Sequence, residues 1–316
     1  MAQVTSGADV RAPAPGDTLS ATRRAVVIGA SVLAAFLLTV VWSAEFVDKT
    51  IGQNVAGSLL GHDPVRTPIA GSAAGIVYAF VSGLAGTFTA CNIAVFGAVA
   101  PMVGEPTSLR RRLWNSLRPL AWLGLGMVVV STTYGAIAGV AGTRMPQFST
   151  ASGRPTLTPR LVQSMIAFGV IGTVFVLLGL VALGVVPDPL ARLSRRFPQA
   201  RSVLVGMMIG GFLIGRPYPL YRVLFRDAAQ SHDPFFGAAA FALQSLGNVL
   251  LMALITVVLV RLTGGRVRRW VAARPGRAAL VTGAAFLVAG VFTVLYWDVR
   301  LLSNVGYLWY PTAPWT

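Results

Sequence analysis

Stretches of about 20 consecutive apolar residues recur along the whole chain, and they limit its fold more than any other feature. A helix of that length matches the hydrocarbon core of a bilayer. The composition agrees, because 55% of the 316 residues are hydrophobic and only 11% are charged. In soluble domains about a quarter of the residues are charged. We therefore predict an all-α polytopic membrane protein.

Seven transmembrane helices are predicted, and the first is an N-terminal anchor helix within residues 25–46. Residues 1–24, rich in Ala, Pro, Gly, Ser and Thr, are expected to form a disordered cytoplasmic tail, and residues 299–316 an extracytoplasmic tail. An arginine pair before an apolar run is also typical of an export signal, but this run is long for a signal core, which favours an uncleaved anchor. The other six spans cover residues 69–99, 119–141, 161–186, 203–224, 235–260 and 278–296.

The basic residues predict how the chain is oriented in the membrane. The chain carries 26 basic and 10 acidic residues, and every basic residue except Lys49 is arginine. About two thirds of the basic residues fall in the N-terminal tail and in alternate loops, which predicts a cytoplasmic N-terminus and an extracytoplasmic C-terminus. We expect a multi-pass protein of a bacterial-type plasma membrane. Because the arginines lie in short loops between apolar runs, topology explains the net charge of +16 better than nucleic-acid binding does.

The chain also shows signs of two related halves. Residues 69–186 and residues 203–298 each hold three predicted spans, and we interpret them as a 3+3 inverted repeat. A repeated unit with an odd number of spans must cross the membrane in opposite directions. Carriers of this build place their working site between the halves, near the midplane of the bilayer. The lead helices of both halves carry glycine interruptions, and an ungapped alignment sets Gly83 on Gly211 and Cys91 on Pro219.

The second lead helix reads GGFLIGRPYPLYR over residues 210–222. Pro217 and Pro219 remove backbone donors inside an apolar run. Lipid cannot satisfy the carbonyl groups that are freed, so we expect this break to face protein or a wet cavity. Arg216 beside the break is either a functional charge inside the membrane or a side chain that reaches the outer interface.

Both lead helices resemble parts of the CcdA/DsbD family, membrane thiol–disulfide proteins of cytochrome c biogenesis. Residues 83–101, GLAGTFTACNIAVFGAVAP, are similar to the first helix of that family, where a glycine-rich start leads to a Ser-Pro-Cys element. Residues 210–254 resemble the family's fourth helix, the loop after it and the fifth helix. The resemblance covers about residues 70–298. In the second half its matching points are Gly215, Arg216, Pro217, Pro219, Gly237, Leu246 and Gly247.

Members of this family move reducing equivalents across the membrane through two cysteines, one in each lead helix. They take electrons from a cytoplasmic thioredoxin-like donor and give them to an extracytoplasmic thiol protein. Here Cys91 is the only cysteine, and Tyr218, Pro219 and Leu220 occupy the place of the second, so no intramolecular disulfide can form. The resemblance implies a divergent member with a thioredoxin-like or cytochrome assembly protein as partner. It would act through that partner's cysteine or as a non-catalytic assembly subunit.

Several polar residues are candidates for a site inside the membrane. Cys91 is open to three interpretations: a small packing residue, a reactive thiol or a soft-metal ligand. Gln244 and Asn248 share one helix face, where they serve interhelical hydrogen bonds or line a polar path. Polar side chains are costly against lipid, so we expect the segment around Cys91 to face the bundle interior or a cavity. With Cys91 as candidate catalytic thiol, the candidate cavity residues are Thr89, Asn92, Arg216, Pro217, Tyr218, Pro219, Gln244 and Asn248.

The alternative function is a small-solute or ion transporter on the same inverted repeat, with Arg216, Asn92 and Asn248 lining its site. The sequence holds no glycine-rich phosphate loop, no Ser-His-Asp set and no cofactor motif. Its two His-Asp doublets fall in predicted loops, where solvation explains them better than metal binding does. Small residues four positions apart are expected to let helices approach closely at two places, Gly135 with Gly139 and Gly206 with Gly210.

Overall fold

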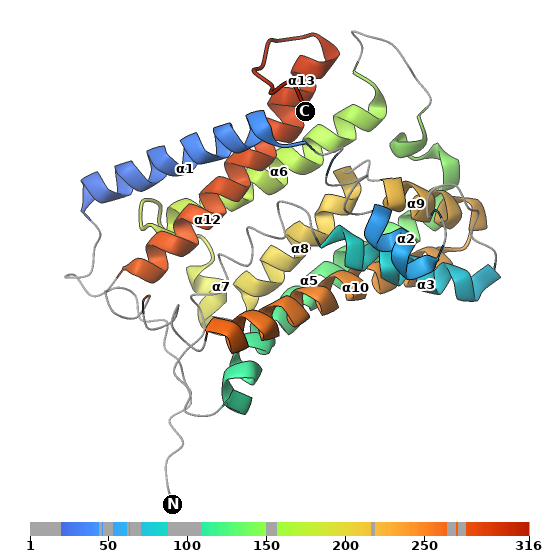
Figure 1. The fold of residues 1–316 in the computed structure, drawn as a ribbon, viewed down its shortest axis with the longest axis horizontal. Helices are drawn as coiled ribbons and strands as arrows, with labels where there is room; N and C mark the ends of the chain where they lie inside the picture. The colour runs from blue at the N-terminus through green and yellow to red at the C-terminus, as the bar shows by residue number, and fades with distance from the viewer. Residues whose placement is uncertain are drawn as a thin grey trace, which may run out of the picture.

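The computed structural model describes residues 20–43, 46, 53–61, 63, 71–87, 109–149, 157–215, 219–263, 270 and 276–315. Within these ranges the chain forms helices joined by turns and contains no strand, so the all-α prediction is confirmed (Figure 1). The helices are α1 (Ala21–Val41), α2 (Asn54–Leu60), α3 (Gly71–Gly86), α5 (Leu109–Ala141), α6 (Pro159–Ala182), α7 (Ala191–Arg196), α8 (Ala200–Gly215), α9 (Pro219–Ser231), α10 (Pro234–Thr263), α12 (Arg277–Val294) and α13 (Arg300–Val305). The short 3-10 helices are η3 (Gly142–Arg144) and η4 (Pro146–Phe148), and a π-helical turn is η5 (Leu295–Val299).

The chain is a polytopic membrane protein. Helices α8 and Leu220–Ser231 of α9 count as one bent span, with 80° between their axes, if they cross the membrane together. A shorter apolar helix, Ala74–Gly86, lies within the predicted first lead helix. The described residues thus hold five or six candidate spans, where seven are predicted over the full length. Five segments are long and apolar enough to cross alone: Ala21–Val41, Leu117–Arg144, Pro159–Ala182, Pro234–Val258 and Arg277–Val305.

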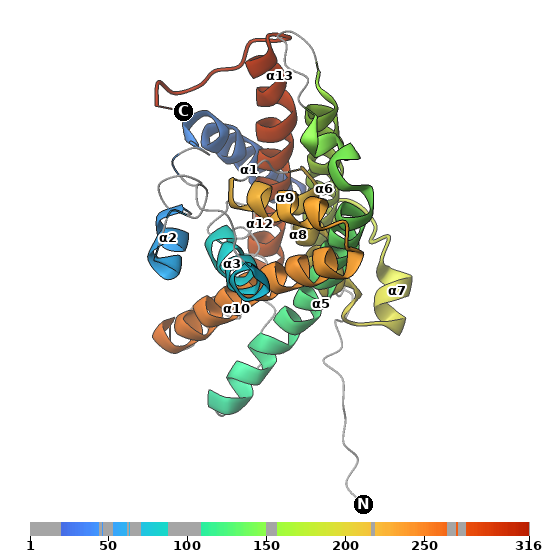
Figure 2. The ribbon, with the colours of Figure 1, turned by 90° about the vertical axis from the view of Figure 1, so that its right-hand side faces the viewer.

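The helices pack in an order that differs from their order along the chain. Helix α10 packs against α3 and α5, α5 also packs against α8, and α8 contacts α6 (Figures 1 and 2). Helix α6 packs against α12, and α12 against the anchor α1. Two clusters of buried apolar side chains fill the interior, one around Phe225 and Phe241 and the other around Phe168 and Phe175. The interior therefore joins helices from both predicted halves.

The last span is longer than predicted. After α12 the chain stays helical through η5 and α13 to Val305, so the predicted tail begins with a helical segment. Arg300 in that segment is buried, and its Nη1 donates hydrogen bonds to the backbone oxygens of Thr39 (2.6 Å) and Trp42 (3.0 Å). Carbonyl groups at the C-terminal end of a helix lack intrahelical donors. Arg300 therefore caps α1 and ties the anchor helix to the last span.

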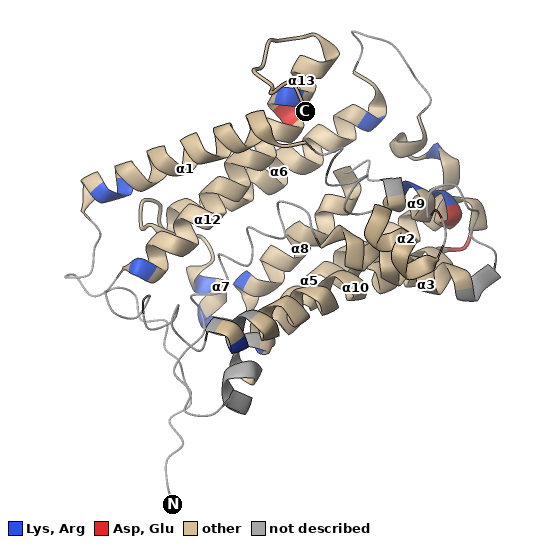
Figure 3. Cartoon of the chain, in the orientation of Figure 1, with Lys and Arg blue, Asp and Glu red and all other residues tan. Residues whose placement is uncertain are grey.

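Charged residues are distributed unevenly between the two ends of the helices (Figure 3). Arg24 at the start of α1 donates to Gly184 O after α6 (2.9 Å), which places these two segments at the same end. Asp188 at that end bonds to Arg201. The opposite end, where α9 and α13 lie, carries arginines together with Asp227, Asp233 and Asp298. The excess of arginines lies at the end that holds the start of α1. The arginines there are Arg23, Arg24, Arg118, Arg192, Arg195, Arg196, Arg201, Arg261 and Arg277.

Glycines set the closest helix contacts, as the two small-residue pairs predict. A Cβ atom on Gly139 would overlap Asp233 O, and one on Gly210 would lie 2.7 Å from Met127 O. Real Cβ atoms essentially never come within 3.0 Å of a neighbour. A side chain at either position would force the backbones apart, so only glycine permits these approaches of α5 to α10 and of α8 to α5.

The contact of α3 with α10 has a counterpart in the contact of α8 with α5. A Cβ atom on Gly83 of α3 would overlap the backbone oxygen of Gln244 in α10. A Cβ atom on Gly206 of α8 would overlap the backbone oxygen of Leu123 in α5 in the same manner. In both interfaces the lead helix therefore presents a glycine to a carbonyl group of the second span.

The reverse contacts follow the same register. Gly247 of α10 meets the backbone oxygen of Phe80, and Gly126 of α5 meets the backbone oxygen of Val203. Phe80 precedes Gly83 by as many residues as Val203 precedes Gly206. Both pairs of helices thus dock glycine against carbonyl oxygen in each direction and at equal spacing.

The interface between α6 and α12 is symmetric, because glycines of each helix make equivalent contacts with the other helix. Gly172 would place a Cβ atom 2.9 Å from Gly290 O, and Gly290 would place one 2.6 Å from Gly172 O. Gly179 and Gly283 approach one another in the same reciprocal way, at 3.0 Å and 3.2 Å. The spacing between the two glycines is equal on both helices, so exchanging α6 with α12 reproduces the interface.

Candidate functional site

A buried polar network lies where α3, α9 and α10 meet. Gln244 of α10 is fully buried, and its Nε2 donates to the hydroxyl of Tyr221 in α9 (3.0 Å). Thr87 at the end of α3 donates from its hydroxyl to Oδ1 of Asn248 in α10 (3.0 Å). The two predicted site residues on α10 therefore face inward together and bind to different helices. Buried polar groups of this kind stabilise a structure only when they are hydrogen-bonded.

Direct contacts bring the end of α3 to the start of α9. A Cβ atom on Gly86 would overlap the hydroxyl oxygen of Tyr221, so the tyrosine side chain lies directly against α3 at this glycine. The hydroxyl of Tyr78 in α3 donates to the backbone oxygen of Leu220 in α9 (3.3 Å). The described residues that flank the two predicted lead-helix interruptions thus lie against one another.

The remaining predicted site residues fall beside these contacts in the sequence. Pro219 is the first residue of α9, and α8 ends at Gly215, so a helix break is present where the two prolines predict it. The other predicted site residues lie outside the described residues: Thr89, Cys91, Asn92, Arg216, Pro217 and Tyr218.

The side-chain amides of two glutamines donate hydrogen bonds to a backbone carbonyl group at the C-terminal end of α8. Gln163 of α6 and Gln147 of η4 both donate from Nε2 to the backbone oxygen of Ile214, at 2.7 Å and 2.9 Å. Both amides also lie within hydrogen-bonding distance of the Tyr134 hydroxyl, at 2.7 Å and 3.0 Å. Carbonyl groups in the last turn of a helix have no intrahelical donor. The side-chain amides therefore replace the backbone donors that the break removes.

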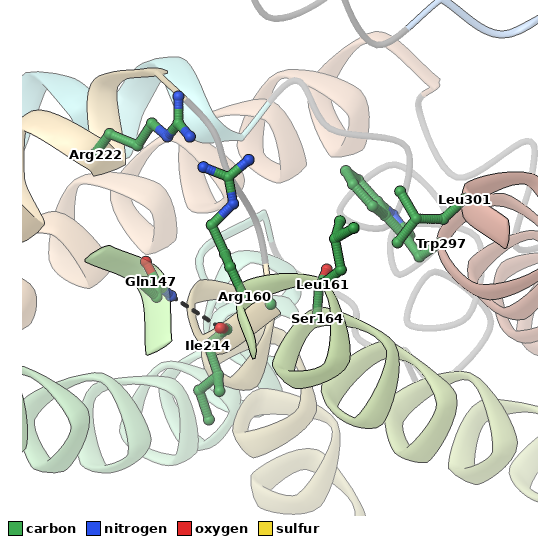
Figure 4. A pocket seen from close by; sticks show the side chains of 9 residues that line it. Gln147, Arg160, Leu161, Ser164, Ile214, Arg222, Trp297 and Leu301 are labelled. Atoms are coloured by element: carbon green, nitrogen blue, oxygen red, sulfur yellow. Dashed lines mark hydrogen bonds between the residues drawn. The ribbon is translucent and has the colours of Figure 1, made fainter. Parts of the chain in front are cut away.

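A pocket opens beside this helix end (Figure 4). About 430 Å³ of space free of protein atoms lies between its lining residues, and this volume includes open solvent outside the pocket. Arg160 of α6 and Arg222 of α9 extend into the same part of it from different helices (Figure 4). The other lining residues are Gln147, Leu161, Ser164, Ile214, Gly215, Trp297 and Leu301. Among the described lining residues, the two arginines carry the only formal charges.

No pattern in the sequence links the residues that line this pocket. In the sequence, Arg160 is an ordinary loop arginine at the start of a predicted span. Arg222 is the last residue of the proline-containing segment. Gln147 lies in the connection between two predicted spans, where a polar residue is unremarkable in the sequence. The one available signal is Gln163, a polar residue in an apolar run, which the structure places at the end of α8.

No group of three or more His, Cys, Asp or Glu side chains with the geometry of a metal site occurs among the residues that the structure describes. Comparisons of the chain with protein-family models, with curated proteins and with solved structures found no match.

Proposed function

We propose that the chain consists of two inverted halves, α3–α5–α6 and α8–α10–α12, behind the anchor α1. The packing supports this interpretation. Exchanging α3 with α8 and α5 with α10 turns the contact of Gly83 with Gln244 into that of Gly206 with Leu123. The α6–α12 interface maps onto itself under the same exchange. In this register Gly83 corresponds to Gly206, whereas the ungapped sequence alignment pairs it with Gly211.

The charge distribution supports a cytoplasmic N-terminus. Arginines in excess of acids lie at the end that holds the start of α1, and cytoplasmic loops carry such an excess. In this orientation α13 and the pocket of Arg160 and Arg222 face the extracytoplasmic side.

The function that we propose is extracytoplasmic thiol exchange of the CcdA/DsbD kind, with Cys91 as the only thiol of the chain. The observation that carries it is the contact of Gly86 with Tyr221, which joins the end of one lead helix to the start of the segment after the other break. Cys91 follows Thr87 by four residues, which limits its Cα to roughly 14 Å from that of Thr87. The family resemblance expects a reactive cysteine in this part of the lead helix.

A single thiol can take part in exchange only together with partner cysteines. The Cys91 thiolate attacks a disulfide of one partner, forms a mixed disulfide and releases the other partner sulfur as a thiolate, which takes up a proton. One thiolate of a dithiol protein then attacks the Cys91 sulfur of the mixed disulfide and releases the partner's remaining sulfur as a thiolate, which takes up a proton. The second thiolate of the dithiol protein attacks its own first sulfur, closes a disulfide and releases Cys91 as a thiolate. Two electrons pass from the dithiol protein to the partner, and Cys91 ends in its initial state.

Transport of a small solute is a second candidate, and the buried network favours it. Gln244 and Asn248 place amide groups inside the bundle beside a helix break, and transporters with inverted repeats bind their substrates at such breaks. This function does not require a thiol, so a variant without Cys91 separates the two candidates.

The test is to trap mixed disulfides in cells by acid quenching and alkylation, followed by non-reducing electrophoresis and mass spectrometry. Thiol exchange predicts a covalent adduct between Cys91 and a thioredoxin-like or cytochrome assembly protein, absent from Cys91→Ser. Full activity of Cys91→Ser in a growth or cytochrome c assay refutes the thiol function. If that variant is active while Gln244→Leu is folded but inactive, transport becomes the better account.

A further inference from the structure

We propose that the pocket between α6, α8 and α9 binds a phosphate-type oxyanion through Arg160 and Arg222. This site does not depend on Cys91 or on thiol exchange. The family resemblance does not lead to this site.

The two arginines create an unbalanced positive charge. Their guanidinium groups are turned toward the same space from helices far apart in the sequence (Figure 4). Neither group makes a hydrogen bond or an ion pair with the residues that the structure describes, and the lining set contains no carboxylate. Like charges brought together raise the free energy of the site, and an anion between them lowers it. Guanidinium groups bind oxyanions with paired N–H donors.

Further donors surround the same space. Ser164 is only 5% exposed and lines the pocket, and its hydroxyl makes no hydrogen bond to a described residue. Helix α6, which has 24 residues, starts at Pro159 directly beside the pocket, so its first turn directs the positive end of its dipole there. The side chain of Thr158 already caps the N–H of Leu161 (3.4 Å), which leaves the N–H of Arg160 for a ligand.

One wall of the pocket is apolar. Trp297 stacks on Phe168 with 4.5 Å between the ring centroids, and Leu161 and Leu301 lie beside Trp297 in the pocket (Figure 4). A charged group held by the arginines would therefore place any attached apolar part against this wall. That combination fits the phosphodiester of an anionic lipid headgroup and also a soluble organic phosphate. The chemistry that the two share is the phosphate oxyanion.

The experiment uses the full chain in lipid nanodiscs with two probes. In phosphatidylcholine nanodiscs the protein is titrated with inorganic phosphate, and binding is followed by thermal unfolding at low and high salt. In a second series, phosphatidylglycerol replaces part of the phosphatidylcholine, and bound lipid is counted by native mass spectrometry. We expect at least one probe to bind and the affinity to fall as salt rises. Binding of phosphate indicates a soluble ligand, and binding of phosphatidylglycerol alone indicates a lipid.

Variants decide whether binding occurs in this pocket. Arg160→Gln and Arg222→Gln are expected to weaken binding about tenfold or more. The matched control is Arg226→Gln, which removes an exposed arginine one turn further along α9 and outside the pocket. Arg160→Lys and Arg222→Lys keep the charge but lose the paired donors, so we expect a smaller loss, and they replace the Gln variants if those do not fold. The proposal is overturned if neither probe binds, if the pocket variants bind as tightly as the native chain, or if Arg226→Gln weakens binding equally.

Discussion

Replacement of Gly83 by alanine is the sharpest perturbation of the packing between the proposed halves. A Cβ atom at this position would overlap the backbone oxygen of Gln244, and its next neighbours are also backbone atoms of α10. A backbone oxygen cannot rotate away as the end of a flexible side chain can. Helix α3 must therefore move away from α10 by roughly 1.5 Å to reach an ordinary C···O separation.

The free-energy change has two parts of opposite sign. Alanine is favoured over glycine in a helix by about 1 kcal/mol. Overpacking costs about 1–3 kcal/mol, and the separation of α3 from α10 also stretches the hydrogen bond from Thr87 to Asn248, worth about 1 kcal/mol. We expect Gly83→Ala to lower the free energy of unfolding by about 1–3 kcal/mol after the helix-propensity gain is subtracted.

The measurement is the unfolding of the purified protein in mixed micelles by sodium dodecyl sulfate, followed by circular dichroism. Gly206→Ala, which meets Leu123 O in the matching interface, is expected to lose a similar amount. Gly29→Ala in α1 is the control, because a Cβ atom there has nothing within 4 Å, and we expect it to be neutral or stabilising. The reasoning is refuted if Gly83→Ala and Gly29→Ala change the free energy of unfolding in the same direction and by similar amounts.

Three further substitutions test individual contacts. Gln163→Leu removes a donor from Ile214 O, and we expect a loss of about 1–2 kcal/mol in the same unfolding assay, with no comparable loss for the exposed Ile166→Leu. Arg300→Met leaves the end of α1 uncapped, so the thermal unfolding midpoint should fall as the stability drops by about 1–3 kcal/mol; an unchanged midpoint contradicts the capping role. Asp188→Asn breaks the pair with Arg201, which is 39% exposed, so the loss should stay below about 1 kcal/mol by the same method.

The sequence is sufficient to predict the helical membrane architecture and some of its packing. Apolar length alone identifies the spans, because a bilayer leaves few other ways to satisfy a backbone. Gly139 and Gly210 stand out as small residues at helical spacing, and both lie at close approaches. Pro217 and Pro219 predict a break, and α8 and α9 are separated at that point.

Other features depend on tertiary contacts that no local pattern encodes. The direction of α9 after the break is set by its packing against α3, α5 and α10, and proline spacing does not specify it. Arg160 and Arg222 come together only because the starts of α6 and α9 line one pocket beside the end of α8. The register of the proposed repeat cannot be read from the sequence either, because Gly83 is matched with Gly206 by contacts with backbone oxygens, which do not depend on the residue type of the partner.

The central claim is that the two interrupted lead helices meet inside the membrane, and an introduced cysteine tests it directly. Cys91 is the only thiol, so Pro219→Cys creates a single pair that mild oxidation can join. The control Gln230→Cys lies on the same helix roughly 16 Å further along. The account predicts an intramolecular disulfide for Pro219→Cys, seen by mass spectrometry as loss of both free thiols, and none for Gln230→Cys. It is contradicted if Pro219→Cys, Leu220→Cys and Tyr221→Cys all fold in the membrane and none of them pairs with Cys91.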